Sequence, residues 1–196
     1  MNLSSGIKSN TQAFLLEQLK RSVEENGGKF YQVSSVEGVG EILIKLVSPS
    51  GQIITAGLDK DAKPVIEALS KKFGWNTVDL ENIKGEPKSA LKTVSVGITG
   101  ADAVASESGS VLFRDYTLAI GAAAFLPEKH VVIASAEKVV PTILDAYELI
   151  WSLIYQRGKV PSRIEAIQGP SKTGDIEKKI IRPSHGPREF HLIVYR

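Results

Sequence analysis

Glycines alternate with acidic and hydroxyl side chains between Val94 and Phe113, and this stretch is the first place to look for chemistry. Glycines after a strand allow positive φ and let a ligand approach main-chain N–H groups, while the acids add charge. The candidate ligand-binding residues here are Gly97, Thr99, Gly100, Asp102, Glu107, Gly109 and Ser110. Asp102 and Glu107 are also catalytic candidates. A structural alternative is equally compatible with the sequence, because Asp102 could cap a helix that begins at Ala103.

A second loop, from Gly169 to Asp175, concentrates hydroxyl groups, glycine and a lysine in a pattern that could cradle an anion. Its candidate binding residues are Ser171, Lys172, Thr173 and Asp175. We expect this loop to lead into a short helical segment. The structural alternative is that Thr173 or Asp175 serves only as the N-cap of that helix.

A third motif contains His185, a catalytic candidate that could titrate near neutral pH, and Arg188, which could bind a carboxylate or phosphate. A His-Gly-Pro turn is more often structural. Ligands of open α/β sheets bind outside the carboxyl ends of strands, and the first two loops are each expected to follow a strand. We therefore predict that loops 97–110 and 169–175 converge on one small-anion site, with His185 and Arg188 beside it. No metal site is predicted.

Hydrophobic periodicity predicts the elements that would position these loops. Helical spacing predicts helices at about 10–25, where Ser9 to Gln12 resembles a capping box, and also at 36–46, 61–73 and 141–157. We expect a turn at 114–116 and an apolar helix or buried loop at 117–125. Apolar and β-branched runs predict strands at 29–33, 52–57, 75–79, 110–113, 130–135, 163–167 and 189–195, with a further strand starting at Val94.

The alternation of strands and helices predicts an α/β fold with a mostly parallel sheet and helices on both faces. The run 130–135 is continuously apolar, as expected for a strand that helices cover on both sides. With 196 residues, 42% of them hydrophobic, the chain is predicted to form a single domain over 1–196. The N-terminal helical segment, 1–28, is expected to pack on that domain.

Composition excludes several classes of function. The 24 basic and 22 acidic residues are interspersed, so nucleic acid is not an expected partner. The absence of cysteine excludes a disulfide, a thiolate nucleophile or a cysteine-bound iron–sulfur cluster in this chain, and no dinucleotide fingerprint is present, so no cofactor is expected. The first residues lack an apolar signal core, and the uncharged run from Tyr116 to Pro127 is too short to span a membrane. We expect a cytoplasmic protein without a membrane partner.

Five motifs resemble, in order and spacing, those of the LUD (lactate-utilisation) domain family, in particular its LutC/YkgG branch. They are Gly97-Ile-Thr-Gly-Ala-Asp102, Ser106-Glu-Ser-Gly-Ser110, His130-Val-Val-Ile133, Gly169-Pro-Ser-Lys-Thr-Gly-Asp-Ile176 and His185-Gly-Pro187. The resemblance implies a NagB/RpiA/CoA-transferase-like fold. It also implies the role of a cluster-free accessory subunit in a system that oxidises L-lactate to pyruvate. The implied partners are iron–sulfur proteins of the LutA and LutB kind and a small carboxylate or phosphate ligand, and a homo-oligomer is left open.

Two enzymatic alternatives follow from the same resemblance. The stretch Ser106-Glu-Ser-Gly109 is similar to the Ser-Glu-Asn-Gly stretch of class I CoA transferases, whose glutamate forms a covalent thioester, but Ser108 replaces the asparagine. We therefore expect Glu107 to lie in a pocket beside Gly100 and Gly109 without acting as a nucleophile. The other alternative is a sugar-phosphate isomerase that uses Asp102.

Overall fold

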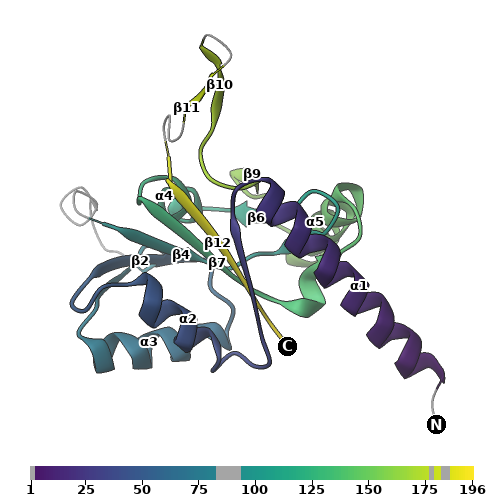
Figure 1. The fold of residues 1–196 in the computed structure, drawn as a ribbon, viewed down its shortest axis with the longest axis horizontal. Helices are drawn as coiled ribbons and strands as arrows, with labels where there is room; N and C mark the ends of the chain where they lie inside the picture. Colours follow the sequence, from purple (N-terminus) through teal and green to yellow (C-terminus); the bar gives the residue numbers. More distant parts are fainter. Residues whose placement is uncertain (1–2, 83–93, 177–178, 182–185) are drawn as a thin grey trace.

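A sheet of six parallel strands forms the centre of the molecule (Figure 1). The structure is a computed structural model that describes residues 3–82, 94–176, 179–181 and 186–196. The strand order is β1-β12-β7-β4-β2-β3. The strands are β1 (Lys29–Val33), β2 (Gln52–Ala56), β3 (Asn76–Asp79), β4 (Val96–Thr99), β7 (Lys129–Ser135) and β12 (Glu189–Tyr195).

Helices cover both faces of this sheet, which confirms the predicted fold class. On one face lie α2 (Val39–Leu46) and α3 (Ala62–Phe73), packed on strand residues such as Ile53. On the other lie α1 (Leu3–Glu25) and α4 (Ala119–Phe125), packed on residues such as Ile54. Neighbouring strand residues point to opposite faces, so a continuously apolar strand supplies both cores.

A second, mixed sheet packs beside the first, with the order β8-β5-β6-β9. One face of it is covered by α5 (Ile143–Arg157), which is held by a capping box at Thr142 and ends at Gly158 in the left-handed conformation. The remaining elements are β5 (Ala103–Ala105), β6 (Ser110–Asp115), the 3₁₀ turn η2 (Ala136–Lys138), β8 (Val139–Val140), β9 (Arg163–Ile167), β10 (Thr173–Ile176) and β11 (Lys179–Ile181). The last two pair in a hairpin that projects from the body (Figure 1).

The start of the first helix and the environment of Asp102 differ from prediction. Helix α1 begins at Leu3, so Ser9 to Gln12 lie within it and form no capping box. Instead, Gln12 donates a hydrogen bond to the Ala136 carbonyl at 2.9 Å. Asp102 caps no helix, because the residues that follow it form β5 and pair with β6.

The segment 163–176 also differs from prediction. Strand β9 has the predicted bounds, but it lies antiparallel to β6 in the smaller sheet. The segment after it is β10 rather than a helix, so neither Thr173 nor Asp175 is an N-cap. The turn expected at 114–116 is also displaced, because β6 continues to Asp115.

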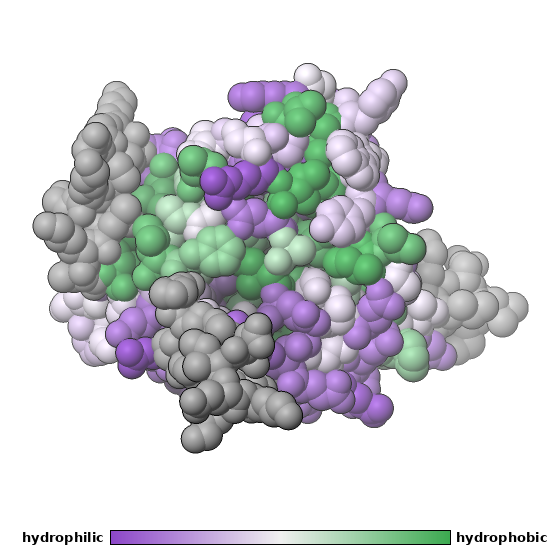
Figure 2. Space-filling view, turned by 90° about the horizontal axis from the view of Figure 1, so that it is seen from above, coloured by the Kyte–Doolittle hydropathy of each residue, from purple (hydrophilic) through white to green (hydrophobic). Residues whose placement is uncertain are grey.

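Hydrophobic side chains reach the surface as well as the core. Figure 2 shows green and pale side chains gathered between hydrophilic ones on the face seen from above. The large exposed apolar residues include Leu118, Phe125 and Leu126 around α4, and Leu144, Trp151 and Tyr155 on α5. Among the described residues, no helix has the length and apolar character needed to cross a membrane.

Candidate functional site

The strand order reverses between β2 and β4, and this marks a crevice at the carboxyl edge of the parallel sheet. After β2 the chain continues into α3 on one face, and after β4 it continues toward α4 on the opposite face. The two connections therefore diverge and leave room between them. In open α/β sheets this switch point is where ligands bind.

The crevice has a volume of about 400 Å³. Its walls include the turn at 57–60 after β2 and the turn at 101–102 after β4. Side chains from more distant segments complete the lining: Glu81, Phe113, Arg114, Tyr116, Ile120 and Arg157. Polar and apolar surface thus meet in one concave site, as is usual for small-molecule pockets.

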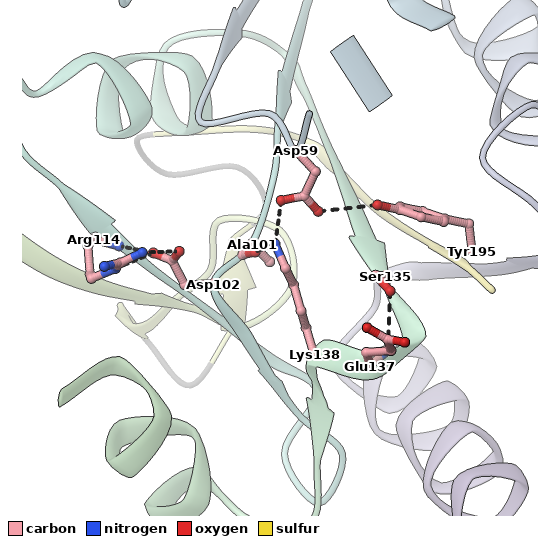
Figure 3. Close-up of polar contacts among 8 residues, drawn as sticks. All are labelled: Asp59, Ala101, Asp102, Arg114, Ser135, Glu137, Lys138 and Tyr195. Carbon is pink, nitrogen blue, oxygen red and sulfur yellow. Dashed lines mark hydrogen bonds and ion pairs between the residues drawn. The ribbon is translucent and has the colours of Figure 1, made fainter. Parts of the chain in front are cut away.

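Lys138 links three strand ends at one side of this crevice (Figure 3). Its ammonium group forms an ion pair with Asp59 and donates a hydrogen bond to the Ala101 carbonyl. Tyr195, at the end of β12, donates to the other Asp59 oxygen at 3.4 Å. Burial and the nearby Asp59 charge raise the pKa of Tyr195 to about 12, so this hydroxyl remains a donor at neutral pH.

The Asp102 carboxylate is fully engaged by Arg114 (Figure 3). The Arg114 guanidinium donates two hydrogen bonds to it, at 2.8 and 3.1 Å, and the Arg114 main-chain N–H adds a third at 2.7 Å. The same contacts, chiefly the hydrogen bonds, raise the pKa of Arg114. A carboxylate held by a bidentate arginine is a structural anchor rather than a free general base.

Two cations at the crevice have no acidic partner among the described residues, namely Lys60 and Arg157. The Arg157 guanidinium lies over the Tyr116 ring, 4.1 Å from its centroid. By contrast, Asp59 and Asp102 each already hold a basic side chain. Glu81, the third acid of the lining, accepts the Gly57 main-chain N–H. The acidic and basic side chains of the lining are thus equal in number, and Lys60 and Arg157 are the cations that could contact a small anion.

Gly97 and Gly100, two of the predicted glycines of the first loop, serve close packing and are not part of the crevice lining. Neither Gly97 nor Gly100 has positive φ. A Cβ at Gly97 would lie 1.8 Å from the Ala123 carbonyl oxygen, and one at Gly100 would lie 2.1 Å from that of Gly57. These contacts let α4 pack on β4 and let the two crevice turns cross closely.

Thr99, also predicted to bind ligand, is fully buried and lies 2.9 Å from His130 Nε2. His130 is equally buried, packed edge-on against Phe190, and its Nδ1 atom has no partner among the described residues. Burial lowers the pKa of His130 to about 3. The ring is therefore neutral at ordinary pH, and this pair belongs to the core.

The rest of the first loop holds helices in place. Glu107 accepts the Ile143 main-chain N–H at 2.7 Å, at the start of α5, and it does not line the crevice. The expectation that Glu107 lies in a pocket beside Gly100 is therefore wrong. Gly109, with φ of 70°, packs against the α1 backbone, and Ser110 bonds Ser108 at 2.9 Å.

The second loop lies at the opposite edge of the parallel sheet. Ser171 donates its main-chain N–H to Pro187, and Arg188 donates to Glu128, just before β7 begins. Both contacts are therefore at the amino edge, whereas Asp102 follows the carboxyl end of β4. The predicted convergence is wrong because β9, which leads to this loop, belongs to the smaller sheet.

Those of the remaining predicted residues that the structure describes are absent from the crevice lining. Ser171 borders a separate cavity of about 100 Å³ with Gly186 and Phe125. Lys172 is exposed beside it, and the backbone of Thr173 and Asp175 lies in β10. His185 lies outside the described residues.

Sequence reasoning missed the residues that build the crevice. These are Asp59, Lys60, Lys138, Arg157 and Tyr195. A usable signal was present, because Asp59 and Lys60 follow the glycine that ends a predicted strand, and Lys138 follows the most apolar strand. Across the described residues, no cluster of three His, Asp or Glu side chains is suited to a metal ion.

Comparisons with known proteins relate the chain to lactate-utilisation proteins. It is 35% identical over 105 residues to lactate utilization protein C of Geobacillus kaustophilus, covering 54% of this chain and 44% of the relative. A second protein C, from Geobacillus thermodenitrificans, is 25% identical over 98% of this chain and 78% of its own length. Lactate utilization protein B of Geobacillus sp. is 25% identical over 80% of this chain, which spans only 33% of that protein.

The fold also matches a solved structure. A DUF162-family protein from Deinococcus radiodurans superposes with a TM-score of 0.66 and 20% identity, covering 94% of this chain and 98% of the other. The profile of the LUD domain matches residues 16–195, which include both sheets, α5 and the crevice. The chain therefore belongs to the LUD-domain family.

Proposed function

We propose that this protein is a LutC-like component of L-lactate utilisation that binds a small carboxylate, or a phosphate, in the crevice between β2 and β4. The observation that carries the proposal is the pair of cations there, Lys60 and Arg157, without an acidic partner among the described residues. The assignment to lactate utilisation rests on the names of the related proteins, which are lactate utilization proteins C.

The size and chemistry of the crevice suit a three-carbon hydroxy acid. A cavity of about 400 Å³ accommodates such a ligand with several waters, since each water takes about 30 Å³ of liquid volume. The planar Arg157 guanidinium can bind a carboxylate through two parallel hydrogen bonds, and Lys60 adds a point charge. Tyr195 and Lys138 hold the turns that shape the site.

Oxidation of lactate requires an electron acceptor, and this chain has no cysteine to hold an iron–sulfur cluster. We therefore assign electron transfer to LutA- and LutB-like iron–sulfur partners. In this proposal the chain binds the carboxylate and completes the assembly. No observation favours a CoA transferase that uses Glu107 or a sugar-phosphate isomerase that uses Asp102. The Asp102 carboxylate is paired with Arg114, and the Glu107 carboxylate is hydrogen-bonded to the start of α5.

Reconstitution tests the role. Lactate-dependent dye reduction is measured with this chain alone, with the iron–sulfur partners alone and with all components together. We expect no reduction by the chain alone and a higher rate for the complete mixture than for the partners alone. Dye reduction by the chain alone would contradict the accessory role. Equal rates for the partners with and without the chain would show that the chain has no role in the reaction.

A further inference from the structure

Helix α5 carries two apolar faces, of which the fold uses only one. Ala146, Ile150 and Ile154 are buried against the smaller sheet. A second row remains in solvent, with exposed fractions of 72% for Leu144, 37% for Tyr147, 58% for Trp151 and 90% for Tyr155. These four residues, named the α5 aromatic face below, are spaced i, i+3, i+7 and i+11. That spacing aligns them along one side of the helix.

A helix that packs on a single sheet needs one apolar stripe, so the α5 aromatic face is surplus to the fold. The helix is rigidly held by its capping box at Thr142 and its C-cap at Gly158. The face is therefore presented on a fixed element rather than on a loop. Contiguous exposed apolar surface of this kind marks an interaction site.

The charges at the two ends of α5 indicate what covers this face. Near the start of the helix lie Glu107, Asp145 and the exposed Glu148. Just past its other end lies the exposed Lys159, while Arg157, in the last turn of the helix, lies over the Tyr116 ring at the crevice. Two antiparallel copies of α5 would place each acidic end beside a basic end, and would also oppose the helix dipoles. A parallel arrangement would place like charges together.

We propose that the α5 aromatic face joins two copies of this chain about a twofold axis near Trp151, with the two α5 helices antiparallel. The four residues of the face are uncharged, and the exposed Glu148 borders them between Leu144 and Trp151. A twofold axis makes the same surface meet itself in both copies. It brings Tyr147 of one copy toward Tyr155 of the other, and Leu144 toward the far end of the partner helix. Tyr and Trp are the side chains that most often anchor interfaces.

The α5 aromatic face supplies the apolar centre of such an interface. Complete burial of an aromatic side chain removes about 150–250 Å² from water, but Tyr147 and Trp151 are only 37% and 58% exposed in the folded chain. The four residues therefore supply part of the roughly 800 Å² per partner of a standard interface, and flanking residues of α5 would supply the rest. The central position of Trp151 makes it the expected energetic anchor.

The mass of the full chain in solution tests the pairing. Sedimentation equilibrium should give twice the 21.2 kDa of one chain for the wild type at tens of micromolar. We expect Trp151→Asp to raise the dissociation constant at least about 30-fold, since loss of an interface anchor costs 2 kcal/mol or more. The matched control is Phe14→Asp, which changes a ring on α1 that is 67% exposed and should leave the dimer intact.

A charge exchange tests the antiparallel orientation. Glu148→Lys and Lys159→Glu should each weaken the dimer about threefold to tenfold, and the double variant should restore it to within about twofold. Thermal unfolding of every variant checks that the fold is retained. The proposal would be overturned if the wild type were a monomer, or if Trp151→Asp left the dissociation constant of the dimer unchanged. It would also be overturned if the double charge variant dimerised more weakly than either single variant, or if a monomer used Trp151 to bind an iron–sulfur partner instead.

Discussion

Among single residues, the charges at the crevice divide into those already paired and those available. Asp59 holds Lys138 and Asp102 holds Arg114, so these four side chains fix the crevice walls. Glu81 accepts the Gly57 main-chain N–H at 3.0 Å and holds the turn after β2. In the proposed function, recognition of an anion falls to Lys60 and Arg157. Sequence reasoning gave that role to other cations, because it could not tell which ones already have acidic partners.

The buried imidazole of His130 predicts how stability depends on pH. Burial lowers the pKa of this ring from 6.5 to about 3. Between these values the unfolded chain binds a proton that the folded chain does not, so the free energy of unfolding falls as the pH falls. The slope from one such group is up to about 1.4 kcal/mol per pH unit.

In His130→Gln this titration is absent. Urea unfolding at about pH 6 and about pH 4 should therefore show a loss of stability that is smaller than the wild-type loss by roughly 2 kcal/mol. Comparing losses within each protein removes the separate cost of disturbing the Thr99 contact. Equal losses in the two proteins would show that His130 does not remain neutral in the folded state.

Among the elements, the start of α5 depends on a residue distant in sequence. The Glu107 carboxylate accepts the Ile143 N–H and also places negative charge at the helix N-terminus. Glu107→Ala should lower the free energy of unfolding by about 0.5–2 kcal/mol, the range measured for lost N-terminal caps. The matched control is Glu24→Ala, an exposed α1 residue, which should change stability by less than about 0.5 kcal/mol. Equal effects in urea unfolding would contradict this role for Glu107.

Local signals predicted most elements closely. Strands β1, β9 and β12 have the predicted bounds, and β2 and β7 differ by one residue, because apolar β-branched runs need no distant information. The sheet to which β9 belongs could not be predicted this way, since pairing with β6 is a long-range choice. Because long-range strand pairing could not be predicted, the position of the candidate site was predicted wrongly as well. Ser171 was expected beside Asp102 because β9 was assumed to lie in the parallel sheet, and Arg188 was placed there as a further source of positive charge.

At the scale of the whole molecule, the topology is the strongest indication of where a ligand binds. The strand order reverses at β2 and β4, and the crevice, the paired acids and the two available cations all lie at that point. The family motifs at 97–102 and 106–110 lie largely in the packing around it. Gly97, Gly100 and Glu107 support the fold around the crevice and are not part of its lining. A motif can therefore identify the family without marking its binding residues.

The most direct test of the crevice is calorimetric titration of the purified chain with L-lactate, pyruvate and phosphate. The titration is repeated on Arg157→Gln, at the carboxyl edge, and on Arg188→Gln, the matched arginine at the amino edge. Loss of a charge-assisted hydrogen-bonding group costs about 1.5–3 kcal/mol, so Arg157→Gln should weaken binding of the preferred anion at least about tenfold. Arg188→Gln should leave the affinity within about twofold of the wild type. Weakened binding in Arg188→Gln with unchanged binding in Arg157→Gln would contradict the crevice and place the ligand at the amino edge.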